Sequence, residues 1–114
     1  MSVDALKNLV RGMMDILILW LLFKRPMHGY GIISKIENIT GLRFTPGAVY
    51  PLLYKMEKSG LIRGRWKKMG EKQRVKLYEI THRGIDVLDD LCNRLHVFLR
   101  ELQGRRKNEG FASH

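Results

Sequence analysis

The chain has 114 residues, and its 21 Lys and Arg against 11 Asp and Glu give a formal net charge of +10. This length suits one domain, and a hydrophobic content of 45% excludes a disordered basic tail. The single cysteine, Cys92, excludes an internal disulfide framework and a zinc site built on several thiolates. A lone thiol suits the reducing cytoplasm, where we expect the protein to act.

The longest apolar run covers residues 16–23, far short of the roughly 20 residues needed to span a bilayer. A signal peptide is the competing interpretation. However, Asp4 precedes the run, and Lys24-Arg25-Pro26 follows it without a cleavage site. We therefore interpret the run as a buried core helix and expect no membrane partner.

Helical and strand-like patterns follow one another in a definite order. They predict helices over residues 4–11, 13–23, 28–40 and 45–59, strands over 61–67 and 74–80, and a last helix from 81 to about 103. Thr45 and Thr81 are candidate N-caps, and Gly41 stands where a helix C-terminal glycine belongs. His28 has no metal-ligating partners, and we interpret it as capping or orienting the helix that follows it.

This order predicts a mostly α (α+β) fold, a winged helix-turn-helix with a two-stranded wing and a long C-terminal dimerisation helix. We expect a winged-helix DNA-binding domain over residues 1–80, the dimerisation helix over 81–104 and a flexible basic tail over 105–114. In a helix-turn-helix, the second helix enters the major groove while the first crosses the DNA backbone.

Most of the excess positive charge lies between residues 55 and 76, where nine basic residues accompany two acidic ones. A local field of this strength favours polyanions, and double-stranded DNA is the partner that we expect. The alternative is a solvated surface that only keeps the protein soluble. The helix and turn signals around the segment favour nucleic acid.

The helix over residues 45–59 has two chemically different faces. Val49, Leu52, Leu53 and Met56 share one narrow arc and are expected to pack inward. The outer face is unusual for an exposed helix because it carries tyrosines, lysines and a glycine, and Pro51 removes one backbone hydrogen bond. Its candidate DNA-binding residues are Thr45, Gly47, Tyr50, Tyr54, Lys55 and Lys58. In the alternative interpretation, the two tyrosines only pack against the first helix or the hairpin.

The tip of the predicted hairpin, residues 67–74, is polar and cationic, and Gly70 suits its turn. We call these residues the wing tip and expect them to lie along phosphates through Lys67, Lys68, Lys72 and Arg74. Trp66 is interpreted as anchored against the core or the base of the last helix. Stacking of Trp66 on an extruded base is the alternative, and it requires single-stranded nucleic acid.

The last helix carries a heptad pattern of apolar residues that continues beyond the reach of a small core. The helix over 13–23 has a similar surplus. Both predict a two-fold homodimer. The candidate interface residues are Leu17, Trp20, Leu21, Leu88, Leu91, Cys92, Leu95, Phe98, Leu99 and Leu102.

Four motifs in order resemble the PadR-like transcriptional regulators. They are His28-Gly29-Tyr30-Gly31-Ile32, the run 47–53, Glu57-Lys58-Ser59-Gly60-Leu61-Ile62 and the run 78–84. The resemblance covers about residues 12–100 and points to the short subgroup with a single C-terminal helix. It implies a dimeric winged-helix repressor in which the 45–59 helix reads DNA and Tyr30 also approaches it. Some members of the family sense small aromatic or drug-like molecules, so the resemblance leaves an effector open as a partner.

We find no nucleophile beside a base, no paired carboxylates and no metal-ligand spacing, so we expect no enzyme activity, cofactor or metal. The favoured function is a dimeric, sequence-specific DNA-binding repressor that recognises an inverted repeat. An architectural DNA-binding protein of low specificity and a winged-helix protein-interaction module are the alternatives.

Overall fold

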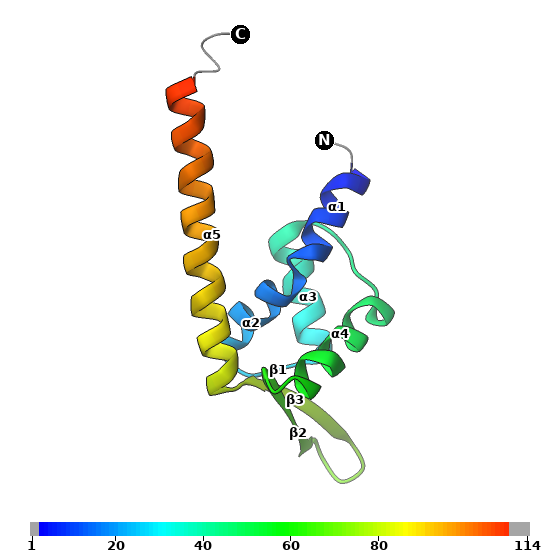
Figure 1. The fold of residues 1–114 in the computed structure, drawn as a ribbon. Coiled ribbons are helices and arrows are strands. Elements are labelled where there is room, and N and C mark those ends of the chain that lie inside the picture. The colour runs from blue at the N-terminus through cyan, green and yellow to red at the C-terminus, as the bar shows by residue number, and fades with distance from the viewer. Residues whose placement is uncertain (1–2, 110–114) are drawn as a thin grey trace.

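A small sheet lies at one end of a group of helices in this computed structural model, which describes the backbone of residues 3–109 and the side chains of residues 4–104 (Figure 1). The elements are α1 (Val3–Gly12), α2 (Met14–Lys24), β1 (Met27–His28), α3 (Gly29–Thr40), α4 (Pro46–Lys58), β2 (Ile62–Lys68), β3 (Arg74–Ile80) and α5 (His82–Glu109). The predicted mostly helical α+β fold, with a β2–β3 hairpin as its wing, is confirmed. None of the helices in the described part of the chain is long and apolar enough to cross a membrane.

The apolar run that the sequence places in a core helix forms most of α2, at the centre of the molecule (Figure 1). Burying these side chains supplies the main driving force for folding, at about 25 cal/mol per Å² of apolar surface. Helix α3, strand β3 and helix α5 pack against α2. The buried core also includes Ile32 and Ile36 of α3, Val49, Leu53 and Met56 of α4, Met27 of β1, Ile62 of β2 and Tyr78 of β3.

The sheet has the order β1-β3-β2, and both of its strand pairs are antiparallel. Strand β1 was not predicted because a strand of two residues shows no periodicity. It follows Pro26 and pairs Met27 with Tyr78 and His28 with Leu77. The start of α3 is therefore fixed directly to the base of the wing.

The helix ends match the capping signals in most places. Gly41 has a φ of 72° and ends α3, His28 Nδ1 accepts from the Gly31 N–H at 3.1 Å, and Thr81 Oγ1 accepts from the Gly84 N–H at 3.0 Å. Thr45 occupies the N-cap of α4 as predicted, although its side chain makes no capping hydrogen bond. Its carbonyl instead accepts from the Ala48 and Val49 N–H groups.

Helix α5 is longer than predicted. It passes through Gly104, where we expected it to end, and reaches Glu109. A helix-interior glycine costs about 1 kcal/mol relative to alanine, which weakens a helix without ending it. The predicted flexible tail is therefore helical over residues 105–109, and residues 110–114 lie outside the described part.

Only the first turns of α5 pack against the rest of the protomer, and the remainder stands away from it (Figure 1). Leu88 is 5% exposed, whereas Phe98, Leu99 and Leu102 are exposed. Leu21 and Leu88 are buried within one protomer, so they have almost no surface left for the dimer interface in which we expected them. The other predicted interface residues keep at least part of their surface.

Candidate nucleic-acid interface

Helix α4 packs one face on the core and presents the other to solvent. Val49, Leu53 and Met56 are buried as predicted, and Leu52 is partly covered. The outer residues Gly47, Pro51, Tyr54, Lys55 and Lys58 are exposed. Two faces of different chemistry on one helix are what a helix needs to read a groove while remaining anchored.

The exposed face of α4 carries positive charge without acidic partners. Within residues 4–104, neither Lys55 nor Lys58 forms an ion pair. The ammonium of Lys58 lies 5.7 Å from the ring centre of Tyr54, a cation–π distance. Pro51 lies on the same exposed face, and α4 continues through it to Lys58. This face can therefore donate hydrogen bonds and charge to an anionic partner.

Tyr50 differs from its neighbours because it is only partly exposed. Its ring packs against Gly29 at the start of α3, and it meets the ring of Tyr30 edge-on, with centroids 6.2 Å apart and an interplanar angle of 72°. Burial raises the pKa of the Tyr50 hydroxyl, and the neighbouring Tyr30 and Tyr78 raise it further. Tyr30 itself is 68% exposed, so the start of α3 extends the surface of α4.

Gly29→Ala tests this contact, because a Cβ at position 29 would overlap the Tyr50 ring and force it to move. We expect DNA affinity to fall roughly tenfold, while the free energy of unfolding changes by less than about 1 kcal/mol. The matched control is Gly31→Ala in the same helical turn, where a Cβ meets only the His28 ring at 3.4 Å. Equal DNA affinities for the two variants, measured by fluorescence anisotropy, would show that the position of Tyr50 does not matter.

The wing extends beyond the core, and all four predicted phosphate-contacting residues of the wing tip are exposed. None of them forms an ion pair within residues 4–104. The hairpin register pairs Lys68 with Arg74 and Lys67 with Val75, so Lys67 lies on one face of the wing and Arg74 on the other. The wing tip therefore presents positive charge on both sides.

The interpretation of Trp66 as anchored against the core is wrong. Trp66 is 58% exposed, and the guanidinium carbon of Arg74 lies 5.2 Å from its ring centre. Its face of the hairpin is covered by the core only as far as Ile62 and Tyr78, and Trp66 lies beyond them. Its cross-strand partner Lys76 was the signal that could have revealed this, because a lysine beside a tryptophan indicates an uncovered face.

Glu57, near the end of α4, ties that helix to the wing. Its carboxylate accepts from Lys76 Nζ at 2.9 Å and from the Gly64 N–H at 3.0 Å. The hydrogen bond from Lys76 lowers the pKa of Glu57, helped by the Gly64 N–H and opposed by burial. The same bond raises the pKa of Lys76. Sequence reasoning missed this pair because its members lie 19 positions apart.

The Glu57 tie predicts a pH-dependent stability difference between the wild type and Glu57→Gln. The pKa of Glu57 is lower in the folded state than in the unfolded state. Its carboxylate therefore stabilises the fold above the ordinary carboxyl pKa, and this stabilisation is lost as the pH falls through the pKa of the folded state. We expect the variant to be about 1 kcal/mol less stable at pH 7, and the two proteins to converge on acidification. Urea unfolding between pH 7 and 3 measures this. Glu71→Gln is the control, since Glu71 forms no ion pair within residues 4–104.

Metal-ligating residues do not gather in the part of the chain that the structure describes. No group of three or more His, Cys, Asp or Glu side chains there could hold a metal ion. The Nδ1 atom of His28 is used in the α3 cap. Cys92 is exposed on α5.

Comparison with known proteins gives a matching family model and two related proteins. The model of the transcriptional regulator PadR-like family matches residues 18–90. The transcriptional regulator YqjI of Escherichia coli (strain K12) is 29% identical over 96 residues, which are 82% of this chain and 44% of that protein. A 37.1 kDa protein in transposon TN4556 of Streptomyces fradiae is 34% identical over 75 residues, 66% of this chain and 21% of that protein. The chain thus spans less than half the length of these two relatives.

Solved structures also match. The padr family transcriptional regulator of Eggerthella lenta DSM 2243 superimposes with a TM-score of 0.78 at 26% identity, covering 89% of this chain and 88% of that one. Bacillus subtilis PadR in complex with operator DNA gives a TM-score of 0.64 at 31% identity, covering 68% of this chain and 45% of that one.

Proposed function

Because the chain belongs to the PadR-like family of transcriptional regulators, which are not enzymes, we propose that it binds operator DNA as a homodimer and represses transcription. In this proposal, α4 enters the major groove and the wing tip lies on the flanking phosphates. The start of α3, with Tyr30, contacts the adjacent backbone. The DNA-contacting residues are Tyr30, Thr45, Gly47, Tyr50, Tyr54, Lys55, Lys58, Lys67, Lys68, Lys72 and Arg74.

The observation that carries the proposal is the exposed face of α4. Its tyrosine and lysine side chains have no acidic partners among residues 4–104, and the helix is held by its buried face. Lysines contact phosphates, and tyrosine hydroxyls and rings contact phosphates and base edges. A likeness to Bacillus subtilis PadR, which was crystallised with operator DNA, supports operator DNA as the partner.

The homodimer is proposed from the uncovered apolar surface. Phe98, Leu99 and Leu102 on α5 and Trp20 and Phe23 on α2 are exposed in one protomer. A second copy related by a two-fold axis would cover such surface and place two α4 helices on one face of the duplex. The operator is then an inverted repeat whose half-sites lie about one helical turn apart. A regulator of this kind acts in the cytoplasm, where the DNA of a prokaryotic cell lies.

Selection from a random-sequence duplex library at near-physiological salt tests the proposal. We expect an enriched inverted repeat. Salt-sensitive retention without enrichment would favour an architectural DNA-binding protein, and no retention would favour a protein-interaction module. Lys55→Gln with Lys58→Gln should abolish enrichment. Arg94→Gln removes one cation that pairs with Asp90 on α5, and it should leave enrichment intact.

A further inference from the structure

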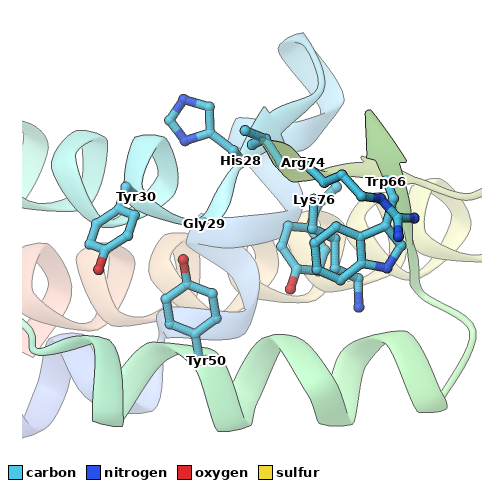
Figure 2. A pocket seen from close by; sticks show the side chains of 9 residues that line it. His28, Gly29, Tyr30, Tyr50, Trp66, Arg74 and Lys76 are labelled. Carbon is cyan, nitrogen blue, oxygen red and sulfur yellow. The ribbon is translucent and has the colours of Figure 1, made fainter. Parts of the chain in front are cut away.

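A hollow of about 420 Å³ lies between the start of α3, α4 and the wing. Figure 2 shows Tyr50 on one side, with its hydroxyl directed at Gly29, and Trp66 on the other, with the Arg74 guanidinium across its indole ring. Tyr30, Lys76 and Tyr78 complete the residues that matter here. We call this the wing hollow.

The walls of the wing hollow are aromatic, but its free charge comes from one residue. The charge of Lys76 is balanced by an ion pair with Glu57 at 2.9 Å, whereas Arg74 forms no ion pair within residues 4–104. The exposed indole provides an apolar surface, and the unpaired guanidinium beside it can donate two hydrogen bonds to an anion. The occupant that suits both has an apolar part and a negative charge within a few ångströms of each other.

We propose that the wing hollow holds one deoxyribose-phosphate unit of the DNA backbone, with the sugar against Trp66 and the phosphate on Arg74. This inference rests on the proposed function. The hollow lies between the helix assigned to the major groove and the wing, and the strand that separates the two grooves passes there. The bases of a duplex stay stacked, so the indole meets the sugar and not a base face.

A backbone contact has a distinctive consequence for recognition. Contacts to sugar and phosphate fix the position of the protein and carry no sequence information directly. Trp66 and Arg74 therefore set how far α4 enters the groove, and their loss weakens binding to every sequence by a similar factor. Base-reading side chains on α4 would instead weaken binding to the operator alone.

Two optical readouts on one sample test the inference. The chain has two tryptophans, Trp20 and Trp66. Fluorescence anisotropy of a labelled duplex from the selection reports binding, while acrylamide quenching of protein emission reports access to the indoles. We expect bound DNA to protect the wild type from acrylamide and to give no such protection in Trp66→Phe. Unchanged quenching at saturating DNA would overturn the inference and leave the proposed function intact. Anisotropy that never rises, with selected or scrambled duplex, would overturn both.

A second test compares the affinities of variants for two different duplexes. Trp66→Ala should weaken binding to the selected duplex and to a scrambled duplex by a similar factor, about tenfold. Arg74→Gln should lower the magnitude of the salt slope by about 2 for a dimer, since each phosphate contact contributes about 0.9. Arg65→Gln is the matched control, because Arg65 lies on the opposite face of the wing and pairs with Glu79 at 2.8 Å. A loss confined to the selected duplex, or an unchanged slope for Arg74→Gln, would overturn the inference.

Discussion

We expect the salt dependence of DNA binding to become weaker when four cations of the wing tip are changed to glutamine in one variant. These cations are Lys67, Lys68, Lys72 and Arg74. Each cation that contacts a phosphate displaces condensed counterions and contributes about −0.9 to the slope of log affinity against log salt. With about four phosphate contacts in each protomer, the wild-type dimer should have a slope of about −7. All four side chains are exposed and free of ion pairs within residues 4–104, so their removal should leave the fold intact.

Anisotropy titrations between about 50 and 200 mM salt, the range in which such slopes are read, measure the effect. A matched control replaces Arg63 and Arg65, which lie in the same hairpin but share the carboxylate of Glu79 at 3.0 and 2.8 Å. We expect that pair to change the slope far less. If the two variants flatten the slope equally, the wing contributes only its overall charge, and the assignment of contacts to its tip is wrong.

Leu99→Asp is expected to convert the proposed homodimer into monomers and to lower operator affinity by at least about 100-fold. Leu99 is 53% exposed in the protomer, so an aspartate there leaves the protomer core untouched. In the proposed dimer, the same aspartate would be buried in an apolar interface. Loss of the second protomer also removes the gain from binding two half-sites at once.

Light scattering at micromolar protein measures the mass, and anisotropy measures the operator affinity of the same sample. Asn93→Asp is the control, because Asn93 is exposed on the same helix outside the heptad positions. We expect it to remain dimeric and to bind normally. If the Leu99→Asp variant remains dimeric, the interface does not include this part of α5, and the exposed Trp20 and Phe23 of α2 become the candidate interface.

Local sequence patterns were sufficient to predict most of the helices and strands. Helical periodicity located the inward face of α4, and Gly41 and Thr81 marked the end of one helix and the start of another. These predictions succeed because a cap or a helix face depends on neighbours within about four residues along the chain. The order of the elements followed from the same local patterns, and the structure confirms it except for β1, which was not predicted.

The amino-acid sequence by itself therefore determined the winged-helix class, the two faces of α4 and the basic wing tip, because each depends on local spacing and charge. Only the tertiary structure decided where the core ends. It left Trp66 beside Arg74 outside the core, buried Leu21 and Leu88 within the protomer, and joined Glu57 to Lys76 across 19 positions. The physical reason is that burial depends on which distant segments reach a side chain, and strand alternation names a face without saying how far along it the core extends.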